Sequence, residues 1–275
     1  MHLLKKIALC IFLSFAFKSQ SDHPIYFLLT HPRATATAFE KILRTHGGLQ
    51  VIHQPYLTPY LLNSLPLDHP YRKSLPKKMS YDEVTDQIFV LAKEGPVFFK
   101  EQSYIVLDYL KAHPEIYLNS QVKFAFLVRD PAKSILSYYK KMPGFDNSTI
   151  GHEQLWELFV ILQEKLGKNL LVIDSDKLLK NPLPILQRLG ESWGLTFTEE
   201  ALHWDKGYAD DWTFKEWYLE VGDSTQLESY RGDIPRLADG TPVYEEIEDL
   251  QERERLQNFF RWQNFYYQKL LEYAY

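Results

Sequence analysis

The sequence predicts an α/β fold of three layers, in which helices cover both faces of a mainly parallel central sheet. Apolar runs alternate with helical stretches from residue 25 onward, which is typical of βαβ units. The first run, Ile25–Thr30, is hydrophobic on both faces, as in a central strand of a parallel sheet. No repeat, low-complexity tract or linker divides the 275 residues, so one large domain accounts for them.

The first half of the chain predicts a strand, a helix and a cover segment. Ile25–Thr30 is the strand, and a helix over 37–46 ends at Gly47 and Gly48. Five prolines between residues 51 and 76 prevent a long regular element there. We expect that segment to lie over the surface as a cover or substrate loop.

The remaining elements follow from caps and apolar runs. Ser80 and Glu83 form a capping box, which predicts a helix that ends near Lys93. Further strands are expected at 97–100, 122–128 and 169–173, and further helices at 131–141, 153–166, 182–193 and 245–273.

Composition excludes several classes of protein. With 45% hydrophobic and 24% charged residues, the chain is neither disordered nor collagen-like. A net charge of -5 provides no excess of basic groups to displace counterions from nucleic acid, so no nucleic-acid partner is expected. The single cysteine, Cys10, excludes an internal disulfide framework.

The first 21 residues resemble a signal peptide. Lys5 and Lys6 precede an apolar run over 7–17, and Ser19 and Ser21 are small residues at suitable cleavage positions. The run is too short for a stable membrane span. We therefore expect an exported protein whose domain covers residues 22–275. The alternative is an uncleaved anchor or a mis-assigned start codon, with a cytoplasmic protein.

The loop after the first strand has the composition of an anion-binding turn. Ala34, Thr35, Ala36 and Thr37 are small residues that let consecutive N–H groups point at one anion, at the positive end of the next helix. Arg33 adds a guanidinium. An ordinary strand-turn-helix connection, with Thr35 or Thr37 as cap, fits the same residues. No Gly-Lys-Ser or Gly-Lys-Thr occurs, so an ordinary ATPase or kinase is not expected.

A second anion site is predicted after the strand over 122–128. Arg129 stands at the strand end, and Pro131 begins the next helix. That helix places Ser134 and Ser137 one turn apart on the same face. The Arg129 guanidinium and a hydroxyl from this face can bind a second phosphate. Two simpler roles explain the residues equally well: Arg129 pairs with a neighbour or with solvent, and Ser137 is a surface residue.

Together, these two sites resemble the sulfotransferase family. The spacing from Arg129 to Ser137 matches the spacing of the family's arginine and serine. The resemblance extends over nearly everything after residue 24, through the stretches 98–101, 171–178, 181–182, 203–207, 217–218, 222–225 and 242–245. It implies a P-loop NTPase-like fold and binding of 3′-phosphoadenosine 5′-phosphosulfate, with the first loop on the 5′-phosphosulfate and the Arg129–Ser137 pair on the 3′-phosphate.

The chain departs from this family at several positions. Serine or glycine is common where this chain has Ala34, Thr35 and Ala36, and lysine is common at the position of Arg33. A glutamate often precedes the proline of the cover segment, where this chain has Gln54, which cannot take a proton. Catalysis is therefore less strongly indicated than donor binding.

The predicted reaction moves a sulfuryl group to a hydroxyl or amine of a small molecule, glycan or protein. We assign Arg33 to the bridging and leaving oxygens and Lys100 to the sulfonate oxygens. Glu101 or His53 is the candidate base. No metal is required. Export would need a compartment supplied with the donor, which is made in the cytosol.

Two other functions remain open. Asp174 and Asp176 follow an apolar strand, as the metal-binding aspartates of many glycosyltransferases do, although a polar turn explains them as well. The second alternative is a non-catalytic relative that keeps the nucleotide pocket, because Gln54 cannot act as the base. A group of aromatic residues in the last third of the chain is expected mainly to pack in the core or a lid. Its members are Trp204, Trp212, Trp217 and Tyr218.

Overall fold

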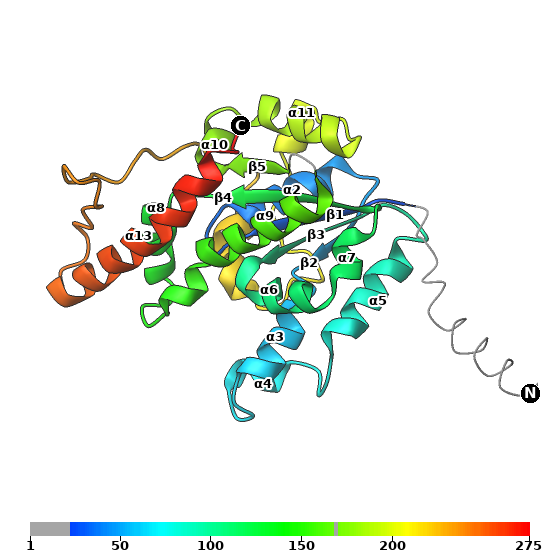
Figure 1. Cartoon of the computed structure of the whole chain (residues 1–275), viewed down its shortest axis with the longest axis horizontal. Helices are drawn as coiled ribbons and strands as arrows, with labels where there is room; N and C mark the ends of the chain where they lie inside the picture. The colour runs from blue at the N-terminus through cyan, green and yellow to red at the C-terminus, as the bar shows by residue number, and fades with distance from the viewer. Residues whose placement is uncertain (1–22, 168–169) are drawn as a thin grey trace, which may run out of the picture.

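The computed structural model describes residues 23–167 and 170–275, and its centre is a five-stranded sheet (Figure 1). The strands run parallel in the order β2-β3-β1-β4-β5. They are β1 (Ile25–Thr30), β2 (Gln50–His53), β3 (Val97–Gln102), β4 (Val122–Val128) and β5 (Leu171–Asp174). The predicted leader over 1–21 lies outside the described residues, as does Asn169 at the start of one predicted strand.

Helices pack on both faces of the sheet, which confirms the predicted three-layer arrangement. One face carries α5 (Tyr81–Leu91), α6 (Ser103–Ala112), α7 (Pro114–Leu118), α9 (His152–Leu166) and α13 (Leu250–Leu271). The other carries α2 (Ala36–His46), α10 (Ser175–Lys180) and α11 (Pro182–Trp193).

The alternation of side chains along β1 explains the two layers. Ile25, Phe27 and Leu29 enter the core on the side of α6 and α9, and Tyr26 and Leu28 enter the core under α2 and α11. All five are at most 3% exposed. Burying a side chain of this size stabilises the fold by about 1.5–3 kcal/mol, so β1 is a strand that tolerates polar substitution on neither face.

Shorter elements complete the fold. They are α3 (Leu57–Ser64), α4 (Pro70–Ser74), α8 (Pro131–Tyr139), α12 (Leu219–Gly222) and the 3-10 turns at Asn147–Ile150, Glu199–Leu202 and Lys215–Tyr218. Within the described part of the chain, no helix combines the length and the apolar character needed to cross a bilayer.

Helix starts with a strong local signal are where the sequence placed them. Ser80 Oγ accepts the Glu83 N–H at 3.1 Å and the Ser80 N–H donates to Glu83 Oε2 at 2.7 Å, so the predicted capping box starts α5. The predicted helix over 245–273 begins later, at Leu250, because Asp249 accepts hydrogen bonds from the first-turn amides and so sets the start.

The cover segment over 51–76 is more regular than predicted. Its prolines do keep the helices short, since α3 has 8 residues and α4 has 5. The expectation missed β2, which pairs in register with β3 from Gln50↔Val97 to His53↔Lys100. That strand is held by hydrogen bonds to a segment about 47 residues away, which composition alone does not reveal.

The strand order determines where a ligand can bind. Because β1 lies between β3 and β4, the chain leaves β1 toward one side and later returns to build the other side. Such a switch point opens a crevice at the carboxyl ends of the strands. Three predicted stretches meet there: the loop after β1, the end of β3 and the turn after β4 (Figure 1).

Candidate active site

The loop after β1 makes a tight turn into α2. Arg33 and Thr35 have positive φ angles of 63° and 68°, which cost a residue with a Cβ on the order of 1–3 kcal/mol. Gln54, at the end of β2, is a third such residue at this edge of the sheet. Thr35 makes no side-chain cap to α2, so its hydroxyl does not satisfy the first-turn N–H groups, which stand at the positive end of the helix dipole.

The Arg33 side chain joins the two predicted anion-binding stretches. Its Nε donates to Ser137 Oγ of α8 at 2.8 Å, and its Nη2 pairs with Glu220 Oε2 at 3.0 Å. Glu220 also contacts Lys141 Nζ at 3.2 Å, and although partial burial opposes it, Arg33 and Lys141 lower the pKa of this carboxyl. The first loop and the helix after β4 therefore share one cluster of charges.

Arg129 ties the end of β4 to the same loop. Its Nη1 donates to the Arg33 carbonyl at 2.9 Å, while its buried Nε has no partner among the described residues. The Arg129 N–H donates to His31 Nε2 at 3.0 Å, and its carbonyl lies 2.8 Å from His152 Nε2. Both main-chain groups of Arg129 are thus held by imidazoles, which fixes the backbone from which the guanidinium extends.

The two imidazoles contact each other at a tilt of 35° and are fully buried. The ring centroids of His31 and His152 lie 3.8 Å apart, and both residues are at most 1% exposed. Gly151, at φ 88°, precedes His152, and a Cβ there would crowd His31 Cβ at 3.2 Å. Burial lowers the pKa of both residues, that of His152 to about 4, so both are neutral at pH 7.

Acid should therefore destabilise the fold through His152. Between the unfolded pKa of 6.5 and the folded pKa of about 4, the unfolded chain binds a proton that the native protein excludes, so stability falls as pH falls through this window. The full effect is about 3 kcal/mol. Urea unfolding followed by circular dichroism at pH 7 and pH 4.5 measures it.

The control is His152→Gln, whose amide can still donate to the Arg129 carbonyl but does not titrate. The difference in stability between wild type and variant should shrink or reverse as pH falls, and comparing the two cancels the opposite slope of Glu101, whose pKa is raised. A difference that stays constant from pH 7 to pH 4.5 would contradict the assignment.

His53, the last residue of β2, lies beside Lys100, its register partner within β3. Both are buried, at 4% and 2% exposed, and both face Glu40 of α2. His53 Nδ1 lies 2.6 Å from Glu40 Oε2, and Lys100 Nζ lies 3.6 Å from the same oxygen. Burial lowers the pKa of Lys100 and Glu40 opposes that shift. His53 Nε2 has no partner within the described residues.

Glu101 is buried beside Lys100 but is engaged by the main chain. Its Oε2 accepts the Tyr56 N–H at 2.9 Å and its Oε1 accepts the Gln102 N–H at 3.0 Å. Burial raises the pKa of Glu101 to about 7, despite these hydrogen bonds and the nearby ammonium. The pKa of Glu101 suits proton transfer near neutrality, whereas its hydrogen bonds hold the backbone at the start of α3.

A covering segment, residues 203–224, lies over these groups. The Tyr218 ring meets the His53 ring edge-on with centroids 4.7 Å apart, and the Trp212 ring lies at 5.2 Å. The Tyr218 hydroxyl donates to Gln54 Oε1. Of the predicted aromatic group, Trp212 and Tyr218 thus cover the candidate base, while Trp217 packs on Tyr71.

The remaining loop residues and the aspartates after β5 are placed as follows. Ala34 is buried, Ala36 and Thr37 are partly exposed in the first turn of α2, and Thr35 Oγ1 accepts a hydrogen bond from Ser175 Oγ at 2.8 Å. Ser175 is a contact to the loop that the sequence did not indicate.

Asp174 and Asp176 have other partners. Asp174 Oδ1 caps α10 by accepting the N–H groups of Asp176 and Lys177, and Asp176 Oδ2 pairs with Lys133 Nζ at 2.7 Å. In the ranges 23–167 and 170–275, no group of three or more His, Cys, Asp or Glu side chains is arranged to hold a metal. The two carboxylates act here as a cap and an ion pair.

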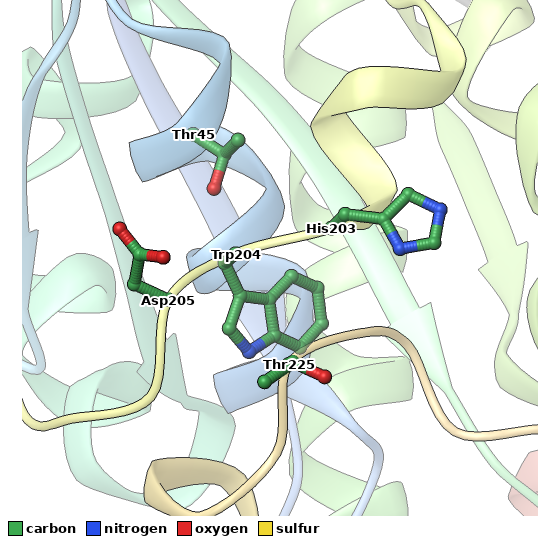
Figure 2. Close-up of a pocket in the computed structure, with 5 residues that line it drawn as sticks. All are labelled: Thr45, His203, Trp204, Asp205 and Thr225. Atoms are coloured by element: carbon green, nitrogen blue, oxygen red, sulfur yellow. The ribbon is translucent and has the colours of Figure 1, made fainter.

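A surface cavity of about 590 Å³ lies elsewhere, beyond the C-terminal half of α2 (Figure 2). Its lining residues are Thr45, His203, Trp204, Asp205 and Thr225. Trp204 Nε1 donates to Ser224 Oγ at 3.3 Å, which joins the two family-like stretches of this segment. None of the predicted site residues lines this cavity, so it does not identify the reaction centre.

Glu40 is the site residue that sequence reasoning missed. A signal was present, since Glu40 shares one helical face with Ala36, Phe39 and Leu43 at i, i+3, i+4 and i+7 spacing. A carboxylate on an apolar face needs a partner. Only the packing of α2 on the sheet reveals that the partners are His53 and Lys100.

Comparison with known proteins gives a family. The sulfotransferase domain family matches residues 27–244 of the chain. A curated relative from Arabidopsis thaliana, branched-chain-amino-acid aminotransferase-like protein 2, is 27% identical over 196 residues, which are 69% of this chain and 34% of that protein. The chain thus spans about a third of the length of the curated relative it matches.

One solved structure shows the same fold. The sulfotransferase domain of the olefin synthase from Synechococcus PCC 7002 superposes with a TM-score of 0.52 at 18% identity, covering 89% of this chain and 97% of that domain. A sulfotransferase from Alicyclobacillus acidocaldarius gives a TM-score of 0.47 at 11% identity, with 91% and 96% covered. The first of these supports a P-loop-like fold of the sulfotransferase type.

Proposed function

This chain belongs to the sulfotransferase domain family, and from that premise we propose that its donor is 3′-phosphoadenosine 5′-phosphosulfate and its acceptor a hydroxyl or amine. The observation that carries the proposal is the convergence of Arg33, Ser137 and Arg129 at one edge of the sheet. A donor with phosphates at both ends of a nucleoside needs cationic groups from two segments, and these segments adjoin.

The two ends of the donor are assigned to different groups. The 5′-phosphosulfate would lie on the first turn of α2, against the N–H groups after Thr35 and the Arg33 fork. The 3′-phosphate would take Arg129, whose buried Nε has no partner among the described residues, and the Ser137 hydroxyl. Since Glu220 now pairs with Arg33, an anion on Arg33 would have to displace or share that carboxylate.

The transfer step is an in-line displacement at sulfur. The acceptor oxygen or nitrogen forms a bond to sulfur as the bond from sulfur to the bridging phosphate oxygen breaks, and the nucleotide leaves with that electron pair. Arg33 stabilises charge on the leaving oxygens and Lys100 on the sulfonate oxygens. The acceptor's proton goes to a base.

Geometry favours His53 over Glu101 as that base. Both Glu101 oxygens accept main-chain N–H groups, whereas His53 Nε2 carries no hydrogen bond to a described residue. Burial lowers the pKa of His53, so the ring is neutral at pH 7 and its free nitrogen can accept a proton. Gln54, which cannot take a proton, instead anchors Tyr218.

A non-catalytic nucleotide-binding relative remains the second candidate. Gln54 stands where a base is common in the family, and the covering segment closes over His53.

For the enzyme, the acceptor would be a small molecule or a glycan or protein hydroxyl. The proposed export of the protein would require a supply of the donor in the same compartment.

Calorimetric titration with two nucleotides tests the donor assignment. We expect 3′-phosphoadenosine 5′-phosphate to bind at micromolar concentration, on the order of -8 kcal/mol. Adenosine 5′-phosphate should bind about 10- to 100-fold more weakly, because the charged hydrogen bonds of one phosphate are lost. Equal affinity for the two nucleotides, or no binding of either, would refute the donor assignment.

Transfer is then measured with ³⁵S-labelled donor on a panel of hydroxyl and amine acceptors, in parallel with hydrolysis of the donor by water. Transfer to any acceptor supports the enzyme. Tight nucleotide binding with neither transfer nor hydrolysis would favour the non-catalytic relative. Addition of manganese should change neither rate, since the assigned groups are cationic side chains and helix N–H groups.

A further inference from the structure

A buried carboxylate lies behind the proposed base. Glu40 is 0% exposed, and its Oε2 lies 2.6 Å from His53 Nδ1. It comes from the second turn of α2, the helix whose first turn faces the proposed phosphosulfate. One helix therefore carries both the anion-binding turn and the partner of the base.

Every other contact of Glu40 keeps it ionised. Its Oε1 accepts hydrogen bonds from Arg44 Nε at 2.9 Å and Trp212 Nε1 at 2.8 Å. Lys100 Nζ lies 3.6 Å from Oε2. Burial opposes ionisation, but His53, Lys100 and Arg44 together lower the pKa of Glu40 well below its usual range. A carboxylate with two donors on one oxygen directs its other oxygen at the imidazole.

An ionised partner at Nδ1 determines the tautomer of His53. An ionised carboxylate only accepts hydrogen bonds, so Nδ1 must carry the proton of the neutral ring and Nε2 the lone pair. The charged groups that act on this ring are Glu40 of α2, Lys100 of β3 and Asp211 of the covering segment, and the Tyr218 ring lies beside it. Arg44 pairs with Glu40 and Asp211. Burial and Lys100 lower the pKa of His53, and Glu40 and Asp211 oppose them.

We infer that Glu40 is a positioning residue for the transfer reaction: it holds His53 with Nδ1 protonated and Nε2 free, and it stabilises the imidazolium that forms when Nε2 takes the acceptor's proton. This inference rests on the proposed function. The proton passes from the acceptor to Nε2 as the bond to sulfur forms, and solvent later removes it. Glu40 itself stays ionised throughout, as the carboxylate of a serine-protease triad does.

The arrangement also links the base to the sulfonate ligand. Lys100, which we assign to the sulfonate oxygens, contacts the same Glu40 oxygen as His53. When the sulfonate attracts Lys100, the carboxylate is left to balance the imidazolium. Glu40 thus touches neither donor nor acceptor and acts through the two side chains that do.

The test compares Glu40→Gln with Arg44→Gln. Arg44 binds the opposite oxygen of the same carboxylate and also pairs with Asp211, so its loss removes two ion pairs but leaves the contact between Glu40 Oε2 and His53 Nδ1 in place. In Glu40→Gln we expect kcat to fall about 100-fold. The acid limb of its pH profile should move to lower pH, because loss of the negative charge disfavours the imidazolium. Arg44→Gln should stay within about threefold of wild type.

A thermodynamic cycle with His53→Gln separates positioning from a general loss of packing. If Glu40 acts through the imidazole, Glu40→Gln should lower kcat little further in the His53→Gln background. Affinity for 3′-phosphoadenosine 5′-phosphate, measured by calorimetry, should be unchanged in each variant. Glu40→Asp keeps the charge beside Arg44 and Lys100 and serves if the glutamine variant does not fold; it should retain the wild-type pH profile at a reduced kcat.

Imidazole ¹⁵N NMR provides a readout that needs no turnover. The wild-type His53 signal, assigned by its loss in His53→Gln, should show the Nδ1–H tautomer at pH 8, and its titration should move to lower pH in Glu40→Gln. An Nε2–H tautomer, or additive effects in the cycle with an unshifted pH profile, overturns the inference. Absence of transfer in wild type with the expected NMR result counts against the proposed function alone.

Discussion

Arg33→Ala is expected to lower kcat for sulfuryl transfer by about 10²–10³-fold, the usual cost of removing one charged group from a transition state. Charge builds up on the bridging oxygen as the bond to sulfur breaks, and Arg33 extends from the loop after β1 with its Nε fixed by Ser137 at 2.8 Å. Because a fixed guanidinium needs no reorganisation during the reaction, its loss should affect kcat more than KM.

Arg33→Lys is the matched variant for this prediction. It keeps the positive charge but not the planar fork. A single ammonium cannot hold Ser137 with one nitrogen and the donor with another, as the guanidinium can. We expect roughly a tenfold loss of kcat. Initial rates with ³⁵S-labelled donor measure both variants. An unchanged kcat in Arg33→Ala would show that the charge on the leaving oxygens is stabilised elsewhere.

Arg129→Ala is expected to weaken binding of 3′-phosphoadenosine 5′-phosphate about 100-fold or more. A buried guanidinium that loses its phosphate partner, or a phosphate that loses its guanidinium, typically costs about 2–5 kcal/mol. Arg129 also holds the Arg33 carbonyl at 2.9 Å, so part of the loss will come from the first loop. Absolute affinity alone therefore does not isolate the 3′-phosphate.

The ratio of the affinities for 3′-phosphoadenosine 5′-phosphate and adenosine 5′-phosphate isolates the contribution of the 3′-phosphate. In wild type, the bisphosphate should bind more tightly than adenosine 5′-phosphate, and Arg129→Ala should bring the two close together, because the loop effect is common to both nucleotides. Ser137→Ala should reduce the ratio less, since it removes one neutral hydroxyl. If Arg129→Ala retains the wild-type ratio, the 3′-phosphate is bound by other groups.

Much of the fold could be predicted because its signals are local. The strands over 25–30 and 122–128 and the helix over 182–193 coincide with the structure, since two-sided hydrophobicity and an N-terminal proline act within a few residues. β2 could not be predicted, because the pattern of Gln50–His53 is weak and its stability comes from pairing with β3.

The candidate site divides in the same way. Arg33, Lys100 and Arg129 could be singled out because each directly follows or ends a predicted strand, and parallel strands bring their carboxyl ends to one edge. That His53 lies beside Lys100 depends on β2, which was not predicted. The direct contact of Arg33 with Ser137 depends on how α8 leaves β4.

Residue types and their spacing along the chain were sufficient to indicate the layers, the sheet edge and the cationic groups, because these depend on local conformation and on the burial of apolar side chains. The pairing of Glu40 with His53, the cover of Tyr218 over that ring and the two imidazoles that hold Arg129 were decided by the packing of segments distant in sequence. Buried polar groups must find partners, but which partner each one finds is a property of the folded arrangement of α2, the sheet and the covering segment.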